Sequence, residues 1–424
     1  MNTPYRPEER HGESAWFKRA SLAMTRPTLC SAALILVSLL AGCAIFQEKG
    51  ADWPMPRADA AASGTSPDRQ IRPPLAPSWE FRPEPVSAPP LVAGGNFYAA
   101  AQDGALYAVS ATNGKLLWQA HSDEPATLLA ISENILYAAA ESGSLSALNR
   151  STGKLLWHRP MDSVTGRGAS RCVGLSVARG AIYLALSDGR LCALRDGAKA
   201  EVLWTQQLDG PIAGGPAVHD ANLVVTLAER PAAACLDARS GEPLWQTPLD
   251  TEMPHALVYA EFYDAVVLSG KSAVVVLERD GGALRWRFDA PGTLIGSPAV
   301  AGGLVVVACN LPDGAGRLMT LDVATGKKVI DRILPGPAGG APIIVNHVIY
   351  LPIAQGNYEY IAMSLWDDTI VGGGYSPERI GSGGRAAIFG ANRLIIVTDI
   401  GSLRIYRRLR LERAGKPASP HSSY

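Results

Sequence analysis

Short apolar runs separated by turn residues recur along most of this chain. In residues 103–118, Asp103-Gly104 precedes a β-prone run over 106–109, and Asn113-Gly114 precedes a second run that ends in Trp118. Asp-Gly and Asn-Gly favour tight turns because the turn positions must tolerate φ > 0. The pattern predicts two short strands joined and bounded by turns.

The same pattern returns at regular intervals, and most copies end in a tryptophan. Successive copies end 39, 47, 41 and 41 residues apart. Their tryptophans are Trp118, Trp157, Trp204, Trp245 and Trp286. Each copy also has an upstream half with two further apolar runs, often led by Pro, as at Pro298. Pro is tolerated at the start or edge of a sheet. A period near forty with four short strands per unit predicts β-propeller blades.

The two ends of the repeat complement each other. Trp79 ends a run that has no upstream half, and the runs over 385–389, 393–398 and 402–406 lack a final strand. The fourth strands of two further units fall near 329–330 and 370–371. We therefore expect an all-β, eight-bladed propeller of four-stranded antiparallel blades over residues 78–408, closed by the N-terminal strand.

The tryptophans at the ends of the repeats are expected to be structural. Their spacing places one at the same position of each blade, where a large ring packs blade against blade. The predicted blade-docking residues are Trp79, Trp118, Trp157, Trp204, Trp245 and Trp286.

A signal sequence precedes the repeats. The apolar run 29–40 is shorter than the roughly 20 residues of a membrane span, and basic residues precede it, as in a secretory signal. It ends in Leu40-Ala41-Gly42-Cys43, which resembles a bacterial lipobox. We predict a signal peptide over 1–42, with Met24 as an alternative start, and lipidation of Cys43.

The segments outside the repeats are predicted to be unstructured. Residues 43–77 are rich in Ala, Pro, Gly and Ser and are interpreted as the lipidated N-terminus and a flexible tether. Residues 409–424 are interpreted as a basic, disordered tail. Ala44, after the lipobox cysteine, is typical of lipoproteins exported to the outer membrane of Gram-negative bacteria.

Composition excludes several classes of function. The 39 basic and 39 acidic residues balance, which argues against nucleic-acid binding. The seven His show no metal-ligand spacing, and no nucleophile-elbow motif is present. We predict no catalytic, cofactor-binding or metal-binding residues. The remaining cysteines lie in strand-like runs, so buried free thiols are favoured over disulfides: Cys172, Cys192, Cys235 and Cys309.

The repeat resembles that of the pyrroloquinoline-quinone (PQQ)-like propellers, over roughly residues 75–408. This superfamily includes quinoprotein dehydrogenases and the outer-membrane assembly lipoprotein BamB. Quinoprotein dehydrogenases typically carry adjacent cysteines and a calcium site, and no two cysteines are adjacent here. The resemblance to BamB implies a non-enzymatic periplasmic scaffold, anchored to the outer membrane by lipid, whose partner is a BamA-like barrel component. The alternative is a propeller that binds a quinone or another small ligand, as a sensor or a relative of the dehydrogenases.

Two stretches depart most from the repeat and are predicted to bind the partner. One follows the strand that ends near Trp245, the fifth tryptophan-bearing strand when Trp79 is counted as the first. It occupies the place where BamB meets its partner, although no copy of the BamB motif is recognisable there. The other lies where the seventh blade should have an Asp-Gly turn. Aromatic and Met side chains in loops are typical interface anchors, although these loops can also pack on their own blades. The predicted partner-binding residues are Met253, His255, Tyr259, Tyr358 and Tyr360.

Overall fold

The computed structural model describes residues 52–66, 68–160, 170–197, 199–375, 384–398 and 401–409. All of these belong to the compact unit Lys49–Tyr424. The predicted signal peptide, the lipidation site Cys43 and residues 410–424 lie outside the described residues. Within the described part of the chain, no helix has the length and apolar character needed to cross a bilayer.

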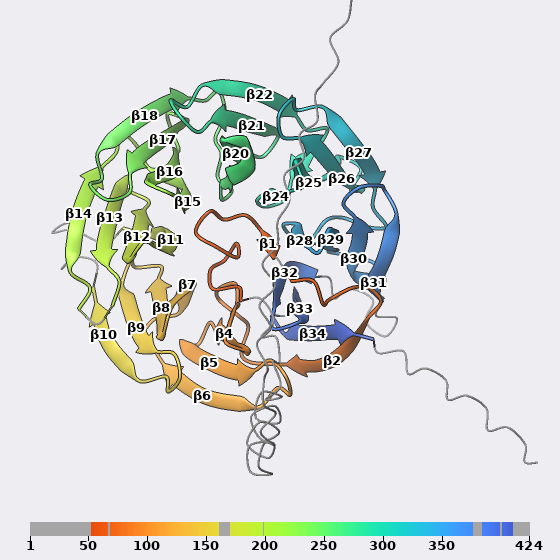
Figure 1. Ribbon diagram of the computed structural model, residues 1–424. Helices are drawn as coiled ribbons and strands as arrows, with labels where there is room; N and C mark the ends of the chain where they lie inside the picture. The colour runs from red at the N-terminus through yellow and green to blue at the C-terminus, as the bar shows by residue number, and fades with distance from the viewer. Residues whose placement is uncertain are drawn as a thin grey trace, which may run out of the picture. The chain divides into compact units, whose positions relative to one another are not determined.

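Eight sheets of mainly antiparallel strands form a ring, and in blades 1 to 7 the strands run from the centre outward in chain order (Figure 1). Blade 1 contains β3 (Leu91–Ala93), β4 (Asn96–Ala100), β5 (Ala105–Ser110) and β6 (Leu116–His121), and blade 2 contains β7 (Ala126–Ser132), β8 (Ile135–Ala140), β9 (Leu145–Asn149) and β10 (Leu155–Arg159). Blade 3 contains β11 (Cys172–Ala178), β12 (Ala181–Leu186), β13 (Arg190–Arg195) and β14 (Val202–Gln207), and blade 4 contains β15 (Ile212–His219), β16 (Asn222–Leu227), β17 (Ala232–Asp237) and β18 (Pro243–Pro248).

Blades 5 to 8 follow the same order, with two variations. Blade 5 contains β19 (Val258–Ala260), β20 (Ala265–Ser269), β21 (Ala273–Glu278) and β22 (Leu284–Asp289), and blade 6 contains β23 (Thr293–Leu294), β24 (Ala299–Ala301), β25 (Leu304–Asn310), β26 (Gly316–Asp322) and β27 (Lys328–Ile333). Blade 7 contains β28 (Ile343–Val345), β29 (Val348–Pro352), β30 (Tyr358–Ser364) and β31 (Ile370–Tyr375), and blade 8 contains β32 (Gly384–Gly390), β33 (Arg393–Thr398), β34 (Leu403–Arg408) and β2 (Leu75–Phe81). The inner strand of blade 6 is split in two, and the outer strand of blade 8 comes from the N-terminal side of the chain.

The predicted eight-bladed all-β propeller is therefore confirmed, including its closure. β2 pairs antiparallel with β34, with Trp79 opposite Ile405 and Phe81 opposite Leu403. β2 therefore supplies the outer strand of blade 8 and covers the edge of β34. An unpaired strand edge at this position would favour aggregation.

The core lies between neighbouring blades rather than in one central cluster. The three inner strands of each blade are mostly buried, whereas the outer strands alternate between exposed and covered positions. Buried apolar side chains form clusters that each join adjacent blades, such as the one that contains Tyr98, Trp118 and Leu129 of blades 1 and 2. The stability of each blade therefore depends on its neighbours.

The repeated tryptophans dock onto the turn that precedes the outer strand of the next blade. The indole nitrogen of Trp118 donates a hydrogen bond to the Arg150 carbonyl oxygen at 2.8 Å, and Trp286 donates to Val323 at 2.7 Å. The other three interior tryptophans make the equivalent bond: Trp157 to Gly197, Trp204 to Ala238 and Trp245 to Arg279. Trp79 stacks on Phe97 of blade 1, with ring centroids 5.5 Å apart.

A buried ion pair crosses the seam between blades 7 and 8. Arg404 on β34 pairs with Glu359 on β30, and Glu359 is only 1% exposed. The Tyr406 hydroxyl donates to the second oxygen of Glu359 at 2.5 Å. Glu80 of the closing strand β2 lies 3.8 Å from the Arg404 guanidinium, so this network links both blades to the N-terminal strand.

Candidate functional site

Residues 52–71 cross the central channel on the face that carries the turns between the first and second strands of the blades (Figure 1). We call them the crossing segment; residue 67 lies outside the description. Their main chain bonds to the inner strand of one blade after another. The bonded amide–carbonyl pairs are Val92 with Trp53, Ile131 with Pro54, Val218 with Ala60, Tyr259 with Ala61, Val300 with Ser63 and Ile344 with Gly64.

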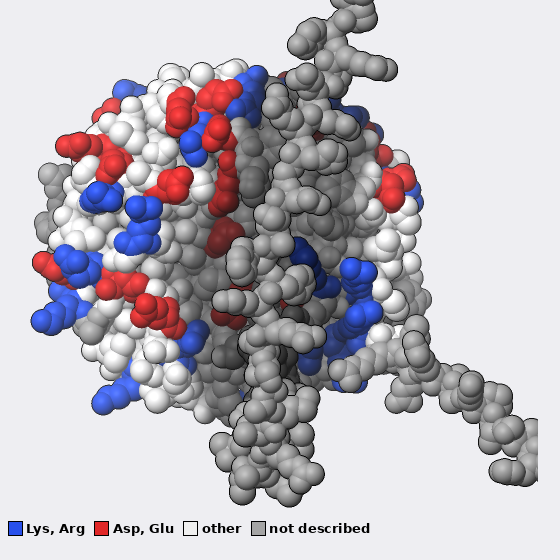
Figure 2. Space-filling model, in the orientation of Figure 1, with Lys and Arg blue, Asp and Glu red and all other residues white. Residues whose placement is uncertain are grey.

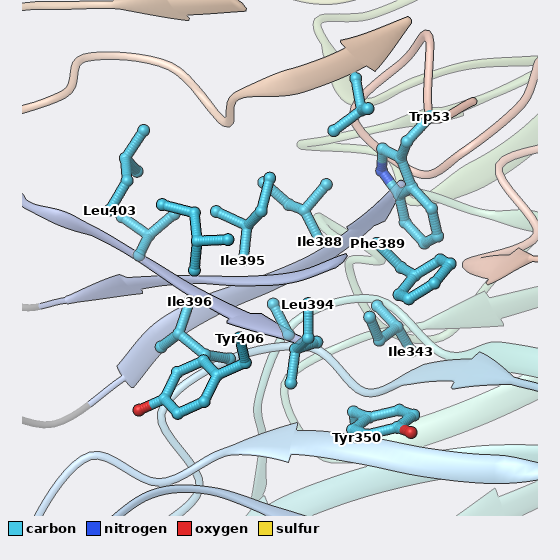
Figure 3. Packing of buried hydrophobic residues seen from close by; sticks show 14 of the residues in the cluster. Trp53, Ile343, Tyr350, Ile388, Phe389, Leu394, Ile395, Ile396, Leu403 and Tyr406 are labelled. Carbon is cyan, nitrogen blue, oxygen red and sulfur yellow. The ribbon is translucent and has the colours of Figure 1, made fainter. Parts of the chain in front are cut away.

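The crossing segment ends as part of the propeller itself. β1 (Thr65–Ser66) pairs in parallel with β28 of blade 7, and Asn392 of blade 8 donates a hydrogen bond to Gln70. Trp53 and Ile71 are fully or almost fully buried in the cluster between blades 7, 8 and 1. Figure 3 shows the Trp53 ring beside Phe389 in this cluster.

The prediction of a flexible tether is therefore wrong from residue 52 onward. The segment has the composition of a linker, with many small residues and no period. It is held instead by main-chain hydrogen bonds to successive blades and by buried anchors such as Trp53.

Arg57 fixes the middle of the crossing segment. Its guanidinium donates to the carbonyl oxygens of Pro298 at 2.5 Å and Pro342 at 3.3 Å, the residues that lead the inner strands of blades 6 and 7. Burial lowers the pKa of Arg57 to about 10. A Cβ added to Gly64 would come 2.2 Å from this guanidinium, so only glycine leaves room for it.

Two small cavities border the crossing segment. One cavity of about 160 Å³ lies against Met55 and Arg57 and is bounded by the inner strands of blades 2 to 4 and by Pro254 and Ala256 in the loop before β19. A second cavity of about 270 Å³ lies between Asp59 and Ser63 of the crossing segment and the Gly302-Gly303 turn. Both are smaller than the roughly 300–1,000 Å³ of typical small-molecule sites.

Aromatic side chains border the second cavity on the same face. Phe262 and Tyr263 belong to η1 (Glu261–Tyr263), a short 3₁₀ turn between β19 and β20, and Phe262 is 95% exposed. Tyr263 lies over Gly303, and Trp366 of blade 7 lies over Gly302. The ring of His347 contacts Trp366, with centroids 5.4 Å apart. We call Phe262, Tyr263 and Trp366 the aromatic row, which runs across the turns of blades 5, 6 and 7.

Carboxylates surround the base of η1. Asp220, Glu261 and Asp264 have side chains that are 75%, 52% and 69% exposed. Arg279 lies 3.9 Å from Asp220 and 3.2 Å from Asp264, and His219 lies 3.3 Å from Glu261. Figure 2 shows acidic side chains running from the blades near β20–β22 toward the centre of this face. The surface thus combines exposed aromatic rings with an excess of negative charge.

The first predicted partner-binding stretch is buried at Met253 and Tyr259. Met253 is 0% exposed, and its carbonyl oxygen accepts a hydrogen bond from Thr226. Tyr259 is 3% exposed on β19, and burial raises its pKa well above the usual value. His255 is half-buried, and burial lowers its pKa. Met253 and Tyr259 cannot anchor a partner, because the loop packs into the core between blades 4 and 5.

The second predicted stretch is divided between core and surface. Tyr360 is 1% exposed and packs edge-on against Tyr406, with ring centroids 5.0 Å apart. Tyr358 is 38% exposed. The prediction is wrong for Tyr360. β30 begins at the exposed Tyr358, and by Tyr360, two residues along the strand, the side chain is already buried in the core.

The exposed aromatic row was missed in the sequence. Phe262 lies three residues after the predicted site Tyr259, but it sits in a turn, where no periodicity marks it. Trp366 belongs to a Trp-Asp pair that does not recur at the blade period. The departure of Trp366 from the repeat was the available signal.

The described residues contain no group of three or more His, Cys, Asp or Glu that could hold a metal ion. Cys172, Cys192, Cys235 and Cys309 are free and buried, as favoured from the sequence. Burial raises the pKa of Cys172 and of Cys235 to about 12. These thiols are therefore protonated and poorly nucleophilic near neutral pH.

The model of one protein family matches the chain over residues 76–199 and 187–357, which together make up more than half of its length. That family is described as outer membrane protein assembly factor BamB. The chain belongs to this family. The structure of BamB from Moraxella catarrhalis is 14% identical, with a TM-score of 0.64, covering 79% of this chain and 100% of that one.

Other similar proteins have different functions. Quinohemoprotein alcohol dehydrogenase from Comamonas testosteroni is 14% identical, with a TM-score of 0.67, covering 86% of this chain and 82% of that one. Tetrathionate hydrolase from Acidithiobacillus ferrooxidans is 27% identical over 70% of this chain and 60% of its own length. Serine/threonine-protein kinase AfsK from Streptomyces griseus is 31% identical over 27% of this chain and 14% of its own length. This chain thus spans less than two-thirds of either curated relative, and the structural likeness shows the fold alone.

Proposed function

We propose that this protein is a non-enzymatic scaffold that binds other envelope proteins at the periplasmic side of the outer membrane, as a BamB-like component of β-barrel protein assembly. The observation that carries the proposal is the crossing segment. The described residues of the crossing segment lie in the channel, where a propeller could otherwise enclose a ligand, and two cavities of about 160 and 270 Å³ border them. The outer surface and the turns remain for protein contacts.

Membership in the BamB family supports this role. The lipobox at Cys43 supports attachment to the membrane by lipid, and the exposed aromatic row offers anchors of the kind that interfaces use. A BamA-like barrel component is the partner that the resemblance to BamB implies.

The second candidate is a propeller that binds a quinone, favoured by the likeness to quinohemoprotein alcohol dehydrogenase. The residues do not fit such a group well. Arg57 and Met55 line a cavity of only about 160 Å³, and no cluster of metal-ligating side chains lies among the described residues. We therefore derive no catalytic step from a quinone.

Affinity purification of the lipidated protein from detergent-solubilised envelopes tests the proposal. We expect the barrel-forming component of the assembly machinery to co-purify in a fixed ratio. Its absence from a well-folded preparation would reject the assembly role. An absorbance spectrum of protein from cells supplied with the quinone provides the second arm, and a stoichiometric quinone band would favour the alternative.

A further inference from the structure

Phe262 is the most exposed large apolar side chain of the described residues, at 95%. No residue of η1 is buried, so the packing of blade 5 does not require a Phe at this position. Phenylalanine is usually buried, and exposed apolar side chains that gather on one face mark interaction sites. Tyr263 and Trp366, 38% and 54% exposed, extend the apolar surface beyond Phe262.

The cavity beside Phe262 can receive a side chain from outside. Phe262 and Tyr263 form one wall, Gly302 and Gly303 another, and Asp59 of the crossing segment lies at its border. A cavity of about 150 Å³ is enough to hold benzene. The 270 Å³ found here therefore has room for the side chain of a Leu or Phe.

The charges around the cavity indicate which partner fits. Asp220, Glu261 and Asp264 are exposed, and Arg279 is shared between the two aspartates. The remaining negative charge favours a cationic partner through electrostatic complementarity. It disfavours the bilayer surface, because membranes that contain anionic lipids repel carboxylates.

We propose that this aromatic and acidic surface binds a segment of a partner protein that carries Lys or Arg next to one bulky apolar side chain. The apolar side chain enters the cavity against Phe262, and the cation lies between Glu261 and Asp264. An arginine there also gains attraction to the exposed aromatic faces. The inference rests on the proposed scaffold function and specifies the surface and the chemistry of its partner.

A photo-crosslinking amino acid in place of Phe262 tests the surface in the full-length protein in native envelopes. The control position is Leu244, which is 52% exposed on the outer strand β18. We expect an adduct at position 262 at least fivefold more abundant than at 244. Mass spectrometry should locate it in a peptide of another envelope protein with a basic residue beside a large apolar one.

Charge neutralisation tests the acidic part separately. Glu261→Gln with Asp264→Asn keeps the size of both side chains, and Asn tolerates the left-handed backbone of Asp264, where φ is 45°. We expect the adduct at 262 to fall at least fivefold, with an unchanged melting temperature. An undiminished adduct would overturn the role of the carboxylates.

The outcomes separate this surface from the proposed function. Adducts to lipid, to a second copy of this chain or to an acidic peptide would overturn the inference. Absence of an adduct while the barrel-forming component still co-purifies would reject the surface and keep the scaffold function. A basic, apolar adduct in a protein unrelated to assembly would support the surface and reject the assembly role.

Discussion

Trp118 of blade 1 lies directly against Gly153 of blade 2. A Cβ added to Gly153 would come 2.6 Å from the indole ring, and the indole nitrogen donates to the Arg150 carbonyl in the same turn. The Thr-Gly turn and the terminal Trp of the repeat are therefore the two halves of one contact between neighbouring blades. The same arrangement joins Trp204 to Gly241, Trp245 to Gly282 and Trp286 to Gly326.

Gly153→Ala should destabilise the protein far more than a matched glycine change. Gly180 has nearly the same backbone, with φ of 73° against 71°, but nothing lies within 4 Å of an added Cβ. Gly180→Ala should cost about 1 kcal/mol, the penalty of a left-handed alanine. Gly153→Ala adds displacement of the Trp118 ring, for a total of about 3 kcal/mol. Urea denaturation measures both, and equal losses would mean that the ring does not need this space.

Contacts of this kind explain why the blade count was predictable. Each Trp and each turn glycine acts on a neighbour one period away, so the repeat itself carries the information. The crossing segment was not predictable, because Ala60, Ala61 and Gly64 use main-chain atoms that carry no sequence signal. The wrong prediction for Met253 and the lack of one for Phe262 have the same reason: both residues lie between strands, where periodicity does not separate exposed from buried residues.

Trp53→Ala tests whether the crossing segment is part of the fold. Trp53 is fully buried against blade 8 and exchanges two main-chain hydrogen bonds with Val92. Loss of a buried Trp side chain should cost about 3–5 kcal/mol. The free energy of unfolding from urea titrations checks this. A tether would predict no change, so a loss below about 0.5 kcal/mol would contradict the structure.

The buried Glu359–Arg404 ion pair can be tested by removing one partner and then restoring stability through removal of the other. Glu359→Leu leaves Arg404, which is 8% exposed, without its main counter-charge and should destabilise by about 3–5 kcal/mol. Adding Arg404→Met removes the stranded charge and should recover most of the loss. Thermal denaturation of both variants provides the measurement. A double variant no better than Glu359→Leu would show that the pair is not coupled.

Stability should fall in alkaline solution because two buried thiols resist ionisation in the folded state. Burial raises the pKa of Cys172 and Cys235 to about 12 from an ordinary 9.0, so only the unfolded chain ionises these thiols near pH 10. Because the pKa of each thiol is higher in the folded than in the unfolded state, its contribution to the free energy of unfolding is fully present below pH 9 and declines as the pH rises toward 12. At pH 10 the loss is about 1 kcal/mol per thiol.

Urea midpoints at pH 7.5, 9 and 10 would reveal this decline. Cys172→Ala should make it shallower than in the wild-type protein. Arg57, whose pKa is lowered to about 10, acts in the opposite direction but only above that pH. A flat profile from pH 8 to 10 would mean that the thiols are accessible or oxidised.

The most direct test of the scaffold role is the amount of folded outer-membrane β-barrel protein in cells that lack this chain. We predict a deficit of heat-modifiable, folded barrels in envelope fractions. We also expect wild-type protein to restore their level, whereas the Cys43→Ala variant should not because it lacks the lipid anchor. Normal levels of folded barrels without the chain, under conditions in which the wild-type protein is expressed, would contradict the assembly role.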